Sequence, residues 1–170
     1  MILCTECYIQ RQNQRDQHDQ QGESASGQTL MLYRNKKDND INQGKWIGLG
    51  GKFEPGESPE QCLIREVREE AGITLTDYTL RGLVTFATTE TLEEPLYIFV
   101  YTASEYEGDL QLDDCAEGTL RWVDTDTVSD LNLWEGDRLF WSWMLEGKPF
   151  FSARFVYEGE KLVEHDVCFH

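Results

Sequence analysis

The segment over residues 58–72 constrains the fold most, because it carries both the start and the stop signals of a helix. Ser58 is suited to the N-cap, Pro59 fits the first helical position, and Gln61 completes a variant of the capping box. Gly72 is a typical residue for ending a helix. Apolar side chains recur with helical spacing on one side, at Leu63, Ile64, Val67 and Ala71. The segment is therefore predicted to be a short helix that packs one face against a core.

The other face of this predicted helix concentrates negative charge. Glu66, Glu69 and Glu70 stand at i, i+3 and i+4, so their carboxylates are neighbours. Like charges repel there, and the helix dipole disfavours the two acids in the last turn. One interpretation is a solvated acidic face on which Arg65 offsets part of the charge. The other interpretation is a site that holds a cation.

The loop before the helix favours the cation site. Gly50 and Gly51 allow a tight turn that presents carbonyl oxygens. Lys52 adds a positive charge, and Glu57 stands just before the N-cap. Magnesium prefers oxygen ligands from a few carboxylates and carbonyls, with water and phosphate completing its shell. Loop and helix together supply such a set of ligands.

These residues follow a known pattern. Gly51, five residues, Glu57, seven residues and then REVREEAGI over 65–73 match the Nudix box in full. The segments GKWIGLGGK, TLRWV, LWEGD and KPFFSARFVYEGEKL resemble MutT-type 8-oxo-dGTP diphosphatases of the Nudix family. The resemblance covers most of the chain and leaves out a Gln-rich stretch. It implies an α/β fold, the Nudix-type α/β/α sandwich with a mixed β-sheet.

The resemblance also implies roles for the residues of the box. It implies magnesium, or manganese, bound by Glu66, Glu69, Glu70 and the carbonyl of Gly50. Arg65 would orient the glutamates, Glu57 would brace the loop, and Lys52 would contact the substrate. Either Glu66 or Glu70 would take the proton of the attacking water.

Further site residues lie outside the box. Glu117, just before the TLRWV segment, is either a metal ligand or base, as the resemblance implies, or an ordinary loop acid. The resemblance implies that Trp134 and Asp137 lie near a purine, where Trp134 would stack on the ring and Asp137 would bind the base edge. The alternatives are that Trp134 belongs to the core and that Asp137 caps a helix. Ile47 follows Trp46 where some relatives have asparagine. Its side chain makes no polar contact with a base, so selectivity for oxidised guanine stays open.

The amino-acid composition narrows the range of expected binding partners. Fifteen Lys and Arg against 32 Asp and Glu give a formal charge of −17, which repels the phosphate backbone of nucleic-acid polymers. A phosphate substrate is expected to arrive with a divalent cation for the same reason. No apolar run has the length of a membrane span, and the first residues lack a basic leader, so a cytoplasmic location is expected. The oligomeric state stays open.

The remaining patterns predict one α/β domain over 1–170. Strands are expected over 1–9 and 29–34, with a flexible Gln-rich loop over 10–28 between them. Apolar runs predict further strands at 78–87, 95–103 and 119–123, then a helix over 137–145 and a closing hairpin. Cys4 and Cys7 form a C-x-x-C pair, but residues three apart on a strand point to opposite faces, so incidental cysteines are expected.

The predicted function is magnesium-dependent hydrolysis of nucleoside triphosphates to the monophosphate and pyrophosphate, with 8-oxo-dGTP or related oxidised purine nucleotides as substrates. Such an enzyme would clean the nucleotide pool. Two alternatives stay open. One is a Nudix hydrolase for ADP-ribose, a sugar nucleotide or a dinucleoside polyphosphate. The other is a non-catalytic module that senses nucleotides.

Overall fold

The structure is a computed structural model of the chain and describes all residues except 13–26, 91 and 114. The predicted Gln-rich loop therefore lies mostly outside the described residues, and its ends at 10, 11 and 28 belong to strands. The elements follow in this order: β1 (Ile2–Arg11), β2 (Gln28–Tyr33), β3 (Trp46–Ile47), α1 (Pro59–Ala71), β4 (Thr74–Thr88), β5 (Leu96–Glu107), β6 (Thr119–Asp124), a 3₁₀ helix (Thr125–Asp130), α2 (Glu135–Leu145), β7 (Phe151–Glu158) and β8 (Lys161–Phe169).

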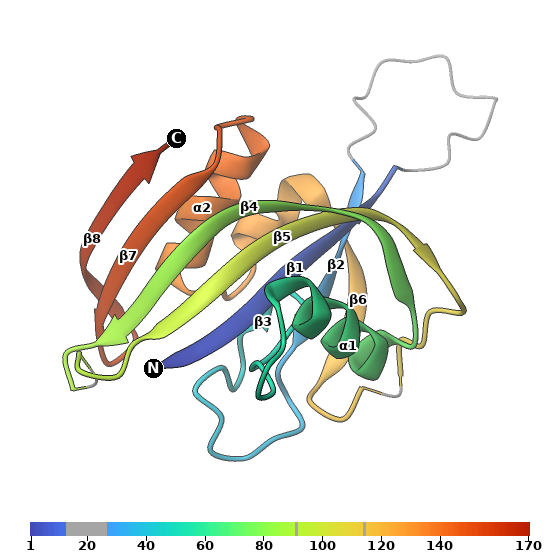
Figure 1. Cartoon of the computed structure of the whole chain (residues 1–170), viewed down its shortest axis with the longest axis horizontal. Coiled ribbons are helices and arrows are strands. Elements are labelled where there is room, and N and C mark those ends of the chain that lie inside the picture. The colour runs from blue at the N-terminus through green and yellow to red at the C-terminus, as the bar shows by residue number, and fades with distance from the viewer. Residues whose placement is uncertain (13–26, 91, 114) are drawn as a thin grey trace.

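The strands form one mixed sheet with the order β3-β2-β1-β5-β4-β7-β8, and β6 pairs with β2. The β1–β5 and β4–β7 pairs are parallel, whereas the other pairs are antiparallel. Helices α1 and α2 lie on opposite sides of the sheet (Figure 1). The predicted α/β/α sandwich with a mixed sheet is therefore confirmed.

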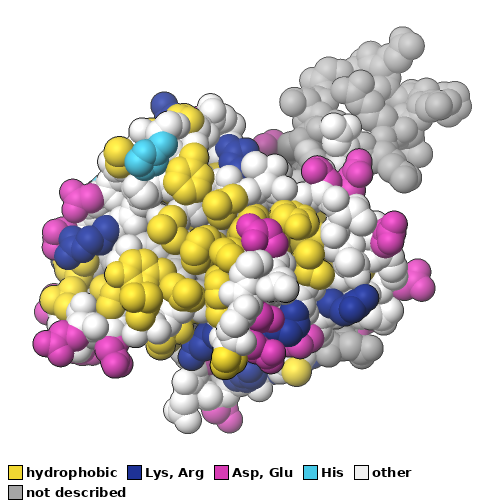
Figure 2. Space-filling model, viewed as in Figure 1, with side chains coloured by type: hydrophobic (Ala, Val, Ile, Leu, Met, Phe, Trp, Pro, Cys, Tyr) yellow, Lys and Arg dark blue, Asp and Glu magenta, His cyan; other side chains and the backbone are white. Residues whose placement is uncertain are grey.

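Each face of the sheet has its own hydrophobic core, because successive side chains of a strand point to opposite faces. Cys7 and Ile9 of β1 pack on the α1 side, while Tyr8 packs among the aromatic residues on the α2 side. Cys4, in contrast to the fully buried Cys7, is only half-buried. To one side of α1, hydrophobic side chains gather on the sheet face (Figure 2).

Helix α1 begins and ends where its local signals predict. The Ser58 hydroxyl accepts a hydrogen bond from the Gln61 N–H at 3.2 Å, and the Gln61 side chain accepts one from the Ser58 N–H at 2.9 Å. Gly72 adopts a left-handed φ of 73°, which glycine tolerates without steric cost. A side-chain cap of this kind stabilises a helix by about 1 kcal/mol. These bonds fix where α1 begins and ends, and so where its glutamates lie relative to the preceding loop.

Helix α2 begins at Glu135, two residues before the predicted start, so the interpretation of Asp137 as its N-cap is wrong. Trp134 occupies the cap with extended backbone and makes no side-chain cap bond. The Tyr157 hydroxyl instead accepts a hydrogen bond from the Gly136 N–H at 2.8 Å. A residue distant in sequence therefore satisfies the helix end. No helix of the described residues is long and apolar enough to span a membrane.

Candidate active site

A cleft of about 710 Å³ runs from the glycine loop and α1 to the start of α2. One end of the cleft is lined by charged residues and glycines, including Gly50, Lys52, Glu66 and Glu117. The other end is lined mainly by apolar and aromatic residues, Ile47, Phe86, Leu96, Ile98 and Trp134, together with Glu6 and Asp137. The cleft thus joins a charged end to an apolar end that contains two acids.

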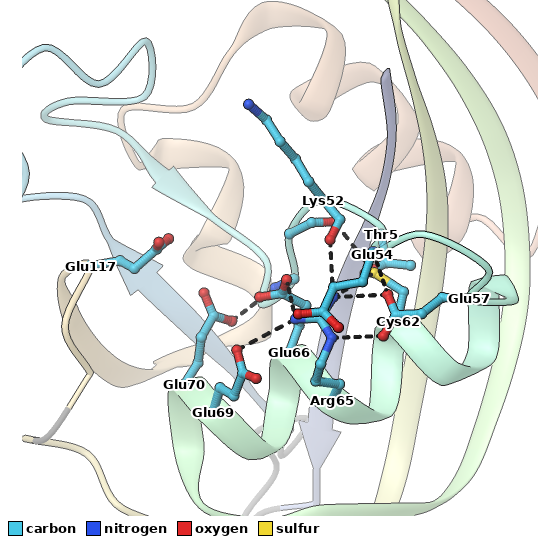
Figure 3. Close-up of polar contacts among 12 residues, drawn as sticks. Thr5, Lys52, Glu54, Glu57, Cys62, Arg65, Glu66, Glu69, Glu70 and Glu117 are labelled. Carbon is cyan, nitrogen blue, oxygen red and sulfur yellow. Dashed lines mark hydrogen bonds and ion pairs between the residues drawn. The ribbon is translucent and has the colours of Figure 1, made fainter. Parts of the chain in front are cut away.

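Arg65 ties helix α1 to the loop before it (Figure 3). Its guanidinium donates hydrogen bonds of 2.7 and 2.9 Å to Glu57, 2.7 Å to Glu66 and 3.0 Å to the Lys52 carbonyl. The hydrogen bonds from Arg65 lower the pKa of Glu57 to about 2. Arg65 and Glu57 thus join helix α1 to the loop, and their orienting and bracing roles stay predictions.

Glu70 is buried, although its helix face is predicted to be polar. Its side chain sits beneath the glycine loop and only 5% of the residue is exposed. The Gly50 N–H donates a 2.8 Å hydrogen bond to Oε2, while Oε1 is buried without a hydrogen-bond partner in the described structure. Burial raises the pKa of Glu70 well above its ordinary value, and the negative charges of Glu117 and Glu66 add to the effect.

The other two glutamates of α1 lie in different surroundings. The Glu66 carboxyl is mostly buried, and a Cβ added at Gly51 would come within 2.5 Å of it. Burial raises the pKa of Glu66, against the opposing hydrogen bond from Arg65. The Glu69 side chain is 60% exposed and lies 3.4 Å from an Arg65 nitrogen. A side chain at position 51 would therefore have to displace the Glu66 carboxylate, which Arg65 holds.

Glu117 faces the carboxylates of α1 across the cleft (Figure 3). It forms ion pairs with Arg34 and Lys37, and Arg34 also donates a 2.6 Å hydrogen bond to Asp40. The structure therefore places Glu117 at the predicted site, in contact with two cations. The sequence analysis did not identify Arg34. This residue directly follows the apolar residues of β2, and that position does not indicate that its side chain points into a cleft.

The candidate metal-ligand atoms around the glycine loop fit a hard divalent cation. They are all oxygens, and Glu70 Oε1 is a buried acceptor with no partner in the described chain. Within the described residues, no three His, Cys, Asp or Glu side chains already surround one point. The side chains that could hold the ion are Glu66, Glu69, Glu70 and Glu117, with the Gly50 carbonyl beside them. Lys52 is exposed, and its ammonium points away from the glutamates (Figure 3).

Trp134 is both a core residue and part of the cleft wall. Only 5% of it is exposed, and its ring makes edge contacts with Phe86 and Tyr157. Its indole N–H donates a 2.8 Å hydrogen bond to Asn42, and the Lys45 ammonium lies 4.5 Å above the ring. These contacts hold the indole firmly. Both predicted interpretations of Trp134 therefore remain compatible with its position.

Asp137 and Glu6 are buried acids at the apolar end of the cleft. Asp137 is 8% exposed and Glu6 is 9% exposed. Burial raises the pKa of Asp137 well above its ordinary value, and the charge of Glu6 raises it further. Sequence reasoning missed Glu6. The available signal was a lone charge between Thr5 and Cys7 in an otherwise uncharged strand segment.

Comparison with known proteins decides the family. Residues 19–144 match the family model of the NUDIX domain. The chain belongs to the Nudix family. Helix α1 and the loop before it carry the Nudix box, so the bracing by Arg65 and the buried Glu70 describe how that box is built in this Nudix chain.

Individual Nudix proteins are similar over most of their length. The Nudix hydrolase YvcI of Bacillus subtilis is 32% identical over 69% of this chain and 75% of its own. The oxidized purine nucleoside triphosphate hydrolase of Danio rerio is 32% identical over 77% of this chain and 82% of its own. The crystal structure of a MutT protein from Bacillus halodurans has a TM-score of 0.79 at 26% identity, covering 98% of this chain and 97% of that one. The predicted MutT-type resemblance is confirmed.

Proposed function

We propose that this Nudix hydrolase cleaves nucleoside triphosphates to a nucleoside monophosphate and pyrophosphate, using magnesium or manganese, and that its substrates are 8-oxo-dGTP or related oxidised purine nucleotides. One observation carries the proposal: a single cleft joins Gly51 and Glu66 of the Nudix box to an apolar, acid-containing end that suits a base. The similarity to the Danio rerio enzyme supports the choice of substrate. The continuous sheet supports a single Nudix domain over 1–170.

Residues at the charged end of the cleft would bind the cation and take the proton of the attacking water. A bound divalent cation would neutralise the charge that develops on the phosphates, and Glu66, Glu69, Glu70 and the Gly50 carbonyl would hold it. Arg65 keeps Glu66 and the loop in place through its hydrogen bonds to both. Glu66 or Glu70 accepts a proton from the attacking water, which adds across a P–O–P bond.

The charged residues across the cleft would bind the phosphates. Arg34 and Lys37 both contact Glu117 and line the cleft, so their positive charges lie at the charged end. A triphosphate entering with its cation would meet these side chains and Lys52. Glu117 would then be available as a metal ligand or base. The formal charge of −17 supports a small nucleotide as the partner, since a nucleic-acid polymer would be repelled.

Base recognition would take place at the other end of the cleft. Asp137 would bind the base edge, and the cleft edge of Trp134 would contact the ring. Ile47 lines this region with an apolar side chain, so it contributes contact area without a hydrogen bond to the base. Selectivity would then depend on the acids rather than on residue 47.

The test is product analysis over a substrate panel with magnesium. We expect 8-oxo-dGTP to be turned over with a higher kcat/KM than dGTP and ADP-ribose, and a chelator to abolish turnover. Equal or faster turnover of ADP-ribose would contradict the choice of substrate. Retained activity in a variant with both Glu69→Gln and Glu70→Gln would contradict catalysis by the Nudix box. Glu105→Gln, an exposed change on β5, is the matched control.

A further inference from the structure

Two acids at the apolar end of the cleft are buried from different elements of the fold. Glu6 comes from β1 and Asp137 from the first turn of α2, and both are more than nine-tenths buried. Both also line the cleft. Burying a carboxylate is costly unless it receives hydrogen bonds, so two such acids in one pocket indicate that something else supplies donors to them.

Glu6 is held in a defined orientation by one of its two oxygens. Oε1 accepts hydrogen bonds from the Tyr8 hydroxyl at 2.8 Å and from the Gly48 N–H at 2.9 Å. Oε2 receives no hydrogen bond from any residue that the structure describes. Asp137 likewise receives no hydrogen bond within the described ranges. The cleft therefore contains a fixed acceptor oxygen with an unused lone pair.

Lys45 and Arg138, whose charges lower the pKa of Asp137, both bond to other partners. Lys45 forms a 2.9 Å ion pair with Glu160 and lies over the Trp134 ring. It is not part of the cleft wall. The wall beside the two acids is instead apolar, formed by Phe86, Leu96, Ile98 and Trp134. Flat apolar walls around an acceptor suit an aromatic ring with N–H donors on its edge.

We infer that Glu6 is a specificity-determining residue, whose Oε2 accepts a hydrogen bond from an exocyclic amine of the substrate's nucleobase beside Asp137. This inference rests on the proposed function of the same cleft. Guanine and adenine carry such an amine, whereas hypoxanthine and unsubstituted purine lack it. A carboxylate accepts hydrogen bonds but repels a carbonyl oxygen, so the amine-bearing bases are preferred.

The experiment compares nucleotide pairs that differ only in the amine. Values of kcat/KM are measured for guanine against hypoxanthine and for adenine against purine deoxynucleoside triphosphates. A hydrogen bond to a buried charged acceptor predicts a preference of about tenfold or more for at least one amine-bearing partner. The pair that shows the preference tells which amine is bound. Wild-type kcat/KM values that are equal within both pairs would overturn the inference.

Glu6→Gln tests the residue itself. The amide keeps an acceptor for Tyr8 and Gly48 but turns an NH₂ donor toward the base amine, so the preference should fall below about threefold. An unchanged preference would refute the role of Glu6. The control Glu105→Gln should keep the full preference, because its side chain is exposed on β5.

A second variant covers the case in which Glu6→Gln does not fold, as judged by circular dichroism. Tyr8→Phe removes one donor to Oε1 and leaves the carboxylate in place. The preference should then fall severalfold because Glu6 is held less firmly, and a full preference would contradict the inference.

The failure of the proposed function can be told apart from the failure of this inference. Absence of hydrolysis for every triphosphate would refute the proposed function alone. Calorimetric binding of GMP and IMP would still test Glu6, because these two monophosphates differ only in the amine. Equal affinity of the wild-type protein for both, together with equal affinity for AMP and purine riboside monophosphate, would refute the inference without reference to catalysis.

Discussion

Replacing Glu70 by glutamine should separate the stability of this protein from its activity. Glu70 is 5% exposed, with one oxygen bonded to the Gly50 N–H and the other buried without a partner in the described structure. Glutamine has the same shape and can still accept the bond from Gly50. The substitution removes a buried negative charge that Glu66 and Glu117 repel. The metal-free variant should therefore be more stable than the wild type.

The magnitude follows from the burial. Glutamine places an NH₂ without a partner where Oε1 lies, so the cost of about 1–3 kcal/mol for one unpaired buried polar group stays. The gain comes from removing the buried charge, which adds to that penalty in the wild type. The neutral bond from Gly50 is weaker than the bond to a carboxylate, which offsets part of the gain. We expect a net increase in the free energy of unfolding of about 1–2 kcal/mol. In a chain of this size that corresponds to a rise in Tm of about 2–8 °C.

The assay is thermal unfolding in the presence of a chelator across a pH series. Burial raises the pKa of Glu70 in the folded state, so the folded protein binds this proton more tightly than the unfolded chain. The free energy of unfolding of the wild type should fall as the pH rises from the ordinary carboxyl range through the raised pKa. Glu70→Gln should lack this fall. The gain from the substitution is therefore largest at the higher pH values.

Magnesium should reverse the order of stability of the wild type and Glu70→Gln. The wild type should gain stability as the metal concentration rises above its dissociation constant, while Glu70→Gln should gain little and should lose activity. Glu69→Gln, at a 60% exposed side chain, should lose activity with almost no change in metal-free Tm. Lower metal-free stability of Glu70→Gln at neutral pH, or equal stabilisation of both proteins by magnesium, would refute the reasoning.

Three further substitutions test the loop and helix contacts. Gly51→Ala should lower kcat/KM by about tenfold or more with a small change in Tm, because its Cβ would lie 2.5 Å from the Glu66 carboxyl, which Arg65 holds. Arg65→Lys should lower kcat by a similar factor in steady-state assays, since one ammonium cannot replace the two bonds to Glu57. Glu57→Gln should flatten the acid-unfolding curve between about pH 4.5 and 2. The wild-type ion pair stabilises the fold above that range and is lost as the pH falls through the lowered pKa of about 2.

The sequence predicts those features that depend on neighbours along the chain. The caps of α1 at Ser58 and Gly72 lie within one helical segment, so residue types and spacing are enough to place them. The i, i+3, i+4 spacing of Glu66, Glu69 and Glu70 likewise follows from helix geometry. The Nudix box therefore identifies both the element and the family before any coordinates are known.

Differences among the three glutamates depend on the tertiary structure. Their spacing in the sequence does not distinguish the three residues. In the structure the glycine loop covers Glu70, Arg65 holds Glu66, and Glu69 stays exposed. The start of α2 also depends on the tertiary structure. Tyr157, on a strand that follows the helix, bonds the Gly136 N–H and places Asp137 inside the first turn.

By itself, the sequence determined the helix, its carboxylates, most of the strands and the family, because local spacing and capping encode them. The short strand β3 and the first residues of β4 were not predicted. Only the tertiary structure decided which acids are buried and which charges meet. Glu6 reaches the same cleft as Asp137 because β1 lies in the middle of the sheet, and Arg34 meets Glu117 from 83 residues away. Burial and long-range ion pairs depend on how distant segments pack together, and no local pattern records that packing.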